Sequence, residues 1–131
     1  MEFTQIDNLL NNSISVKLVR ANNSPVIIGF LYNEFKAVQR SVISGIELES
    51  KLRDFIESNE EATAEPDDLE SRAKRYLDTW ADHGFLRKFP NDNGETQYEL
   101  TTETEKTLQW VENLDKKDFI GTESRFKDIF N

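Results

Sequence analysis

The side chains of this sequence that could act in acid–base catalysis or bind a metal ion include one histidine and two pairs of neighbouring acids. His83 stands at the expected end of a helix, where a cation suits the helix dipole, so we assign it a structural role. Glu60-Glu61 and Asp67-Asp68 are adjacent in sequence, and because consecutive side chains diverge, neither pair forms a facing acid and base. Without cysteine or a second histidine, the sequence offers no thiolate metal site and no catalytic triad.

Backbone motifs for catalysis are also missing from the sequence. The five glycines are scattered singly, and the chain has no Gly-rich phosphate loop, no zinc-protease motif and no nucleophile elbow. We therefore predict that the chain is not an enzyme, needs no cofactor and no metal ion, and acts by binding other macromolecules.

Contact with nucleic acid is the remaining chemistry that the side chains could support. The bases that could form one edge of such an interface are Arg72, Lys74, Arg75, Arg87 and Lys88. The helix expected over residues 66–83, however, has five acids against three bases, and the hairpin over 86–100 has three acids against two bases. The whole chain has a net charge of −9, whereas ligands of duplex DNA usually neutralise several phosphates. A solvated face is favoured, and a DNA-binding winged-helix transcriptional regulator is the alternative function.

Apolar residues at helical spacing predict a mainly helical chain. The expected helices are one that carries Ile6, Leu9 and Leu10, a short one over Ser15–Ala21, and others that start near Ser24, Ser44, Pro66, Thr102 and Thr122. Capping signals mark four of these starts: Ser24 before Pro25, Ser44 with Glu47, the acids Asp67 and Asp68 after Pro66, and Thr102 with Glu105. Gly84 is expected to end the third core helix in a left-handed conformation.

The apolar stripes of these helices are expected to form one core. They comprise Ile27, Leu31, Phe35 and Val38 in the first core helix, Leu48, Leu52, Phe55 and Ile56 in the second, and Leu69, Ala73, Tyr76, Leu77 and Trp80 in the third. We interpret both Trp80 and Trp110 as core aromatics rather than as side chains that stack on a ligand.

After Gly84 the pattern changes to that of a β-hairpin. Residues 85–89 are strand-like, residues 90–94 form a turn in which Asn93 and Gly94 supply positive φ angles, and residues 97–100 return. Three helices followed by a hairpin is the order of a winged helix. We therefore predict an N-terminal helical extension over 1–23, a winged-helix domain over 24–114, and the start of a further helical segment over 115–131.

Both ends of the chain carry more apolar residues than such a core requires. The surplus is Ile6, Leu9 and Leu10 at one end and Phe119, Ile120, Phe126, Ile129 and Phe130 at the other. These residues either pack back onto the core or form an interaction surface, since sizeable exposed apolar patches usually mark one. The sequence leaves both alternatives open.

The sequence also bears on the compartment. No segment approaches the ~20 apolar residues of a membrane span. The first residues lack the basic and then apolar pattern of a signal peptide. Together with the absence of cysteine, these features favour a cytoplasmic protein that does not contact membranes.

Several short segments, in order along nearly the whole chain, carry a family resemblance. They are Val19-Arg20-Ala21, Ser24-Pro25, Phe30-Leu31, Phe35, Tyr76–Trp80, Gly84–Lys88, Tyr98–Thr101 and Phe119–Arg125. This ordered set resembles the JetA/MksF proteins, which are MukF-like kleisin subunits of bacterial condensin-type SMC complexes, including the Wadjet plasmid-defence system.

The resemblance implies that the chain is the N-terminal part of a longer kleisin, which fits its end inside an apparent helix. It implies a homodimerising winged-helix scaffold that serves plasmid defence or chromosome organisation. The SMC ATPase and a small winged-helix (KITE, MukE-like) subunit would bind through later segments of the full-length protein. Any contact with DNA would occur only within the complex, and DNA cleavage would belong to a separate nuclease subunit.

Overall fold

The computed structural model describes residues 1–59 and 68–130, with side chains described as far as Lys116. Its elements, in chain order, are α1 (Phe3–Asn12), α2 (Ile14–Arg20), α3 (Ser24–Leu31), the π-helical turn η1 (Tyr32–Lys36), β1 (Val42–Ser44), α4 (Gly45–Ser58), α6 (Leu69–Asp82), β2 (Leu86–Pro90), β3 (Thr96–Leu100) and α7 (Thr102–Phe130). The described chain is mainly helical with a small antiparallel sheet, as the sequence predicts.

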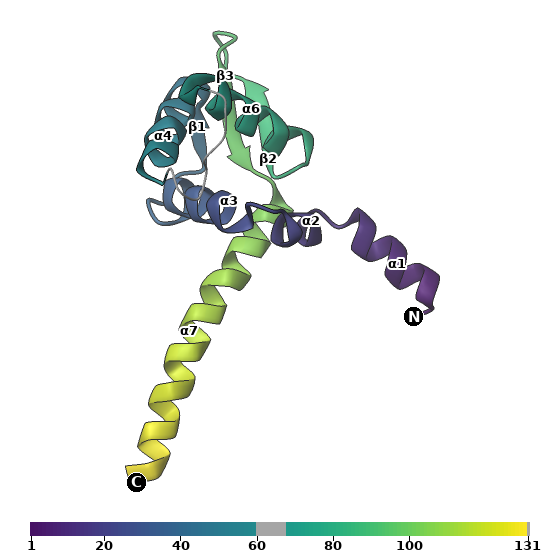
Figure 1. Cartoon of the computed structure of the whole chain (residues 1–131), viewed down its shortest axis with the longest axis vertical. Coiled ribbons are helices and arrows are strands. Elements are labelled where there is room, and N and C mark those ends of the chain that lie inside the picture. The colour runs from purple at the N-terminus through teal and green to yellow at the C-terminus, as the bar shows by residue number, and fades with distance from the viewer. Residues whose placement is uncertain (60–67, 131) are drawn as a thin grey trace.

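Figure 1 shows one body, made by α3, α4, α6 and the sheet, from which two helices extend. α2 packs against the first turns of α7. α1 projects to one side of the body, and α7 continues away from it in another direction (Figure 1). The two ends of the chain therefore lie outside the body, and neither α1 nor the second half of α7 covers the sheet.

The sheet contains one strand more than the predicted hairpin. Its three strands lie in the order β1-β3-β2, and both pairings are antiparallel. β2 and β3 form the expected hairpin, with Leu86 opposite Leu100. β1 pairs along the other edge of β3, with Ile43 opposite Tyr98. β1 therefore joins the linker before α4 to the hairpin, and its buried Ile43 belongs to the core.

The turn of the hairpin differs from the expected one in a single backbone angle. Gly94 has a φ of +80°, as predicted, whereas Asn93 is not among the described residues with positive φ. The carboxamide of Asn91 accepts hydrogen bonds from the N–H groups of Asn93 and Glu95, each at 2.9 Å. This side chain holds the turn, so that only the glycine needs the left-handed conformation.

Aromatic rings from three helices meet at the centre of the core. Trp80 on α6 is 2% exposed, and its ring centroid lies 5.8 Å from that of Tyr76 and 5.9 Å from that of Phe30 on α3. Phe55 of α4 completes the group at 5.4 Å from Phe30. The predicted core role of Trp80 is therefore confirmed.

A π-helical turn interrupts the first core helix. Ala37 and Arg40 donate backbone hydrogen bonds to the carbonyls of Tyr32 and Phe35, five residues earlier in each case. The wider turn rotates the following residues relative to the α-helical stripe. Phe35 remains buried, but Val38 is exposed, so the prediction of Val38 as a core residue is wrong.

Capping at the first two core helices agrees with the sequence only in part. The hydroxyl of Ser44 accepts a hydrogen bond from the N–H of Glu47 at 3.2 Å and so caps α4, as predicted. The Glu47 carboxylate, expected to return to Ser44, pairs with Arg40, and this hydrogen bond lowers the pKa of Glu47. For α3 the predicted cap is wrong, because Ser24 is the first residue of the helix and Asn23 holds the cap position.

The third core helix begins later than predicted. α6 starts at Leu69, where the carboxylate of Asp68 accepts hydrogen bonds from the N–H and the hydroxyl of Ser71 at 2.9 and 3.1 Å. These two bonds hold the pKa of Asp68 below its ordinary value. Pro66, the expected first residue, lies outside the described residues.

α7 is a single helix of 29 residues. The predicted break between residue 114 and Thr122 is wrong, because the intervening charged residues are tolerated in a helix and a lone Gly121 costs only ~1 kcal/mol. The cap is Thr101 rather than Thr102: its hydroxyl accepts from the N–H of Thr104 at 3.3 Å and donates to the carbonyl of Gly84 at 2.7 Å.

Long as α7 is, it does not resemble a membrane span. Among the described residues, no helix combines the length and the apolar character that crossing a membrane requires.

Replacing Gly84 with alanine should destabilise the fold more than the same change at Gly94. Both residues have φ near +80°, so each substitution carries left-handed strain of about 1–2 kcal/mol. A Cβ on Gly84 would also lie 2.8 Å from Cδ1 of Ile14, whereas nothing lies within 4 Å of one on Gly94. Urea unfolding of the two variants measures the difference. An equal or larger loss of stability in Gly94→Ala would contradict the packing of α2 against the α6–β2 corner.

Candidate interaction surfaces

Arg72, the first of the five bases predicted to form a basic edge, is buried in the structure. Arg72 is only 6% exposed, so it belongs neither to the solvated face that the sequence favours nor to the alternative nucleic-acid edge. It precedes Tyr76 by four residues and Trp80 by eight, which places all three on the same buried side of α6. This spacing is the sequence signal that could have identified Arg72 as buried. Lys74 and Arg75 are exposed, and the Arg75 guanidinium lies 5.4 Å from the centroid of the Tyr76 ring.

The two bases of the hairpin are exposed but already have partners. Arg87 forms an ion pair with Glu99, which stands opposite it on β3, and its guanidinium lies 4.2 Å from the Phe89 ring centroid. The Lys88 ammonium lies 3.7 Å from a carboxylate oxygen of Asp78 on α6. Binding of phosphate by either base would compete with these acids.

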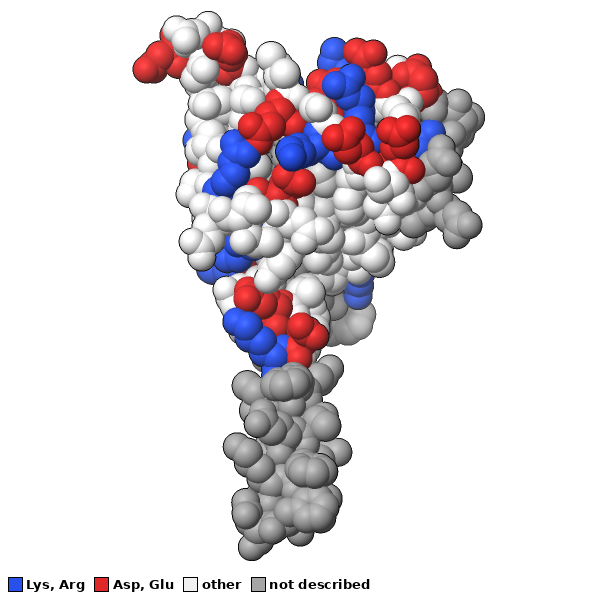
Figure 2. Space-filling view, turned by 90° about the vertical axis from the view of Figure 1, so that its left-hand side faces the viewer, with Lys and Arg blue, Asp and Glu red and all other residues white. Residues whose placement is uncertain are grey.

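A hollow of about 300 Å³ lies where the N-terminus of α4, α6 and the hairpin meet. Its charged lining residues are Glu49, Lys74, Asp78, Lys88 and Glu95. Acids outnumber bases there, and Figure 2 shows acidic and basic side chains intermixed over the face it views, without a continuous basic patch. Lys74 and Lys88 thus lie in a hollow where acids outnumber bases, which does not favour a polyanion.

At the N-terminal end, the apolar residues of α1 are exposed rather than packed on the core. Ile6 and Leu10 are each 42% exposed, Leu9 is 57% exposed and Phe3 is 85% exposed. No residue of α1 is buried. Of the two alternatives left by the sequence, packing back onto the body does not occur here. The apolar side of α1 is open to another molecule.

At the C-terminal end, the remaining predicted interaction residues cannot be placed in the same way. Phe119, Ile120, Phe126 and Phe130 belong to the backbone of α7, but their side chains lie outside the described residues. The described part of α7 contributes Leu114, which is exposed.

A second apolar surface, which the sequence analysis does not predict, lies between α2 and α7. Trp110 is 54% exposed, so its predicted core role is wrong. It lines a groove of about 210 Å³ together with Ser15, Val16, Val19, Lys106 and Thr107. We call this hollow the α2–α7 groove. Val16 and Val19 form its wall on α2, and its lining is mainly apolar, with Lys106 as its one charged residue. Trp110 lies two residues after the buried Leu108, on the outer side of α7.

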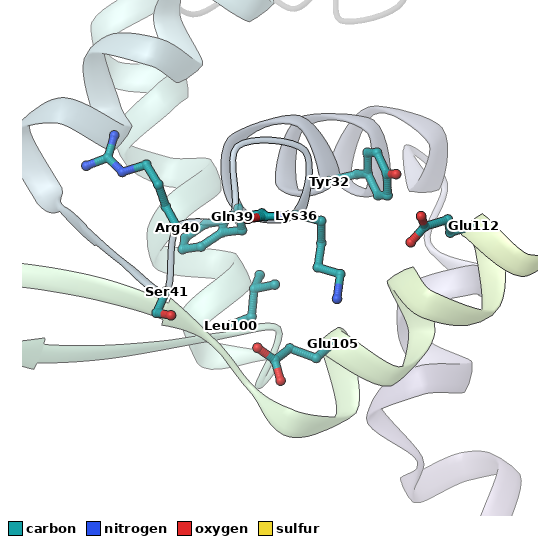
Figure 3. Close-up of a pocket in the computed structure, with 9 residues that line it drawn as sticks. Tyr32, Lys36, Gln39, Arg40, Ser41, Leu100, Glu105 and Glu112 are labelled. Carbon is teal, nitrogen blue, oxygen red and sulfur yellow. The ribbon is translucent and has the colours of Figure 1, made fainter.

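The π-helical turn borders a third hollow, of about 400 Å³. Figure 3 shows Lys36 pointing into it from η1, while Glu105 and Glu112 border it from α7. Gln39, in the loop that follows, has a φ of 54° and is the one residue other than glycine with a positive φ in the described chain. Residues other than glycine with a positive φ often cluster at binding sites. Lys36 and Arg40 thus share this hollow with Glu105 and Glu112.

Metal coordination is a further role to consider for the His, Asp and Glu side chains of the described residues. No three His, Asp or Glu side chains in this part of the chain are placed to hold a metal ion. His83 is the C-cap of α6, and its ring lies edge-on to Phe85 at 5.5 Å. Three of the acids considered above, Glu60, Glu61 and Asp67, lie outside the described residues.

Comparison with known proteins links this chain to a family. The model of the DUF3375 family, described as a protein of unknown function, matches residues 8–131. A protein of Mycolicibacterium smegmatis, described as uncharacterized, is 30% identical over 132 residues, which cover 98% of this chain and 28% of that protein. The chain thus spans little more than a quarter of this curated relative. No solved structure gives a significant match.

Proposed function

This chain belongs to the DUF3375 family, and we propose that it is a non-catalytic dimerisation and scaffold domain of a kleisin subunit in a bacterial SMC complex. One observation supports a binding role above all others: the apolar side of α1 is exposed along its whole length. Exposed patches of large apolar side chains usually mark protein interfaces. The net charge of −9 favours a protein partner over a nucleic acid.

The domain at the centre of this proposal is a winged helix. Three helices, α3, α4 and α6, are accompanied by β1 after the first helix and by the β2–β3 hairpin after the third. In this interpretation the hairpin is the wing, and α6 occupies the place of a recognition helix. Because Arg72 is buried and Lys88 lies near Asp78, α6 serves the core and the surface charge balance rather than base recognition.

The role in an SMC complex rests on the ordered resemblance to JetA/MksF proteins. The matching segments lie on α2, α3, η1, α6, the hairpin and the second half of α7. Of the residues that line the α2–α7 groove, they include Val19. In this proposal the domain joins two copies of the full-length kleisin, which bind the SMC ATPase and the KITE subunit through later segments. The assembly would act in plasmid defence or chromosome organisation in the cytoplasm.

Co-purification of two tagged copies tests this function. The chain is co-expressed with two different affinity tags, and one tag is used for capture. We expect the second copy to be retained in a comparable amount through washes at high salt, because an apolar interface is not screened by salt. Recovery of the captured copy alone would contradict the dimerisation role.

A titration with fluorescently labelled duplex DNA separates this function from that of a DNA-binding regulator. We expect no saturable binding by the isolated chain, even at low salt. The double variant Lys74→Ala and Arg75→Ala, which removes the two exposed bases of α6, should behave identically. Binding that weakens steeply with salt and disappears in the double variant would support the regulator instead.

A further inference from the structure

α1 is an amphipathic arm attached to the body through one residue. At 100° per residue, Phe3, Ile6, Leu9 and Leu10 lie on one side of the helix, while Thr4 and Asn8 lie on the other. The arm has ten residues and is therefore ~15 Å long. It carries no Lys or Arg, which a helix lying on an anionic membrane surface would need on its polar side. Its apolar side therefore fits a protein groove rather than a lipid surface.

The link between α1 and α2 prevents the arm from covering its own body. Ser13 is the C-cap of α1 and also the N-cap of α2. Its N–H donates to the carbonyl of Leu9 at 3.0 Å, and its hydroxyl accepts from the N–H of Val16 at 3.2 Å. Helices that pack side by side are usually joined by 2–8 residues. Folding α1 back along α2 would break both caps, so the described body does not cover its apolar side.

The α2–α7 groove matches the arm in chemistry. Val16, Val19 and Trp110 offer an apolar surface, and Lys106 is the one charged residue of its lining. α2 contains two bases, Lys17 and Arg20, and no acid. α1 contains one acid, Asp7, and no base. Asp7 borders the apolar side of the arm, next to Phe3 and Leu10 in the helical projection. The arm thus has an acid beside its apolar side, and the mainly apolar groove has a base, Lys106, in its lining.

We propose that two copies of this chain exchange arms, with the apolar side of α1 from each copy seated in the α2–α7 groove of the other. Because both copies contribute the same two surfaces, the arrangement is reciprocal and closes as a symmetric dimer. Each copy covers its partner's Trp110 and has its own arm covered, so two equivalent contacts form at once. This inference rests on the proposed dimerisation function and names the surfaces that carry it.

Cysteine cross-linking between differently labelled copies tests the exchange, and the natural absence of cysteine makes the reaction specific. One copy carries Ile6→Cys at the centre of the arm, and the other carries Val19→Cys in the groove wall. After mixing and re-equilibration, a short bismaleimide reagent is added. The matched control replaces Ile6→Cys with Thr4→Cys, two residues away on the opposite side of α1. The mass of the unmodified chain is measured in parallel by light scattering.

We expect the Ile6→Cys and Val19→Cys mixture to give about ten times more cross-linked heterodimer than the control, because thiols held within reach react at a high effective concentration. If the chain is dimeric by light scattering but the two mixtures cross-link equally, arm exchange is overturned while the dimerisation function stands. A chain that remains monomeric at high concentration overturns both.

Discussion

Replacing Trp80 with alanine should lower the free energy of unfolding by about 3–5 kcal/mol, the cost of removing a large aromatic side chain from a closed core. Trp80 is 2% exposed and contacts the rings of Tyr76 and Phe30, so its loss leaves a cavity between α6 and α3. Domains of this size are stable by only about 5–15 kcal/mol, so the variant should unfold at markedly lower urea concentration. Urea titration followed by far-ultraviolet circular dichroism measures the change.

Trp110→Ala is the matched control for this experiment. The side chain is of the same type but is 54% exposed, so its removal should cost less than about 1 kcal/mol. Both variants are measured in dilute solution, where self-association contributes little to stability. Equal losses in the two variants would contradict the placement of Trp80 in the core and of Trp110 outside it.

Replacing Ile6 with glutamate should weaken self-association at least about 100-fold while leaving the fold intact. An ionised carboxylate buried in an apolar groove costs several kcal/mol, and each 1.4 kcal/mol corresponds to about a tenfold change in affinity. A reciprocal dimer contains the substitution twice, so the two costs combine. Ile6 does not belong to the hydrophobic core. The thermal unfolding temperature of the monomer should therefore be unchanged. Sedimentation equilibrium over a range of concentrations gives the dissociation constant.

Thr4→Glu serves as the control for Ile6→Glu. It adds the same charge to the same helix, but on the polar side, and a carboxylate in the first turn is compatible with the helix dipole. Its dissociation constant should remain within about threefold of the original value, since rim charges usually contribute less than ~1 kcal/mol. Equal weakening by both variants would indicate a general charge effect rather than burial of the apolar side of α1.

Strong local patterns predicted much of this fold. The stripe of α6, the Ser44 cap and the left-handed Gly84 all follow from residues close together in sequence. The hairpin is also predictable from local sequence, because its two strands and its turn lie within a short segment. In each case one residue type satisfies one local requirement, so the sequence alone carries the information.

The features that escaped prediction depend on distant partners or on unusual hydrogen bonding. β1 has three residues, too few to display an alternating pattern, and it is a strand only because β3 lies beside it more than 50 residues later. The π-helical turn depends on bonds five residues apart, which no common residue pattern signals. Val38 was misplaced for that reason.

The site was harder to predict than the fold because exposure depends on packing between helices. Arg72 has a charged side chain, yet its spacing to Tyr76 and Trp80 places it on the inner side of α6. Trp110 has an apolar side chain, yet α2 covers only part of α7 and leaves it open in the α2–α7 groove. Residue type alone suggests the opposite in both cases. The apolar side of α1 was recognised from sequence, but its exposure required the structure.

The mass of the unmodified chain in solution tests the dimerisation role most directly. Sedimentation equilibrium at several concentrations distinguishes one copy of 15.2 kDa from two. We predict a concentration-dependent shift to twice that mass, insensitive to salt because the contact is mainly apolar. A single species of 15.2 kDa at the highest concentrations would contradict the role of this domain as a dimerising scaffold.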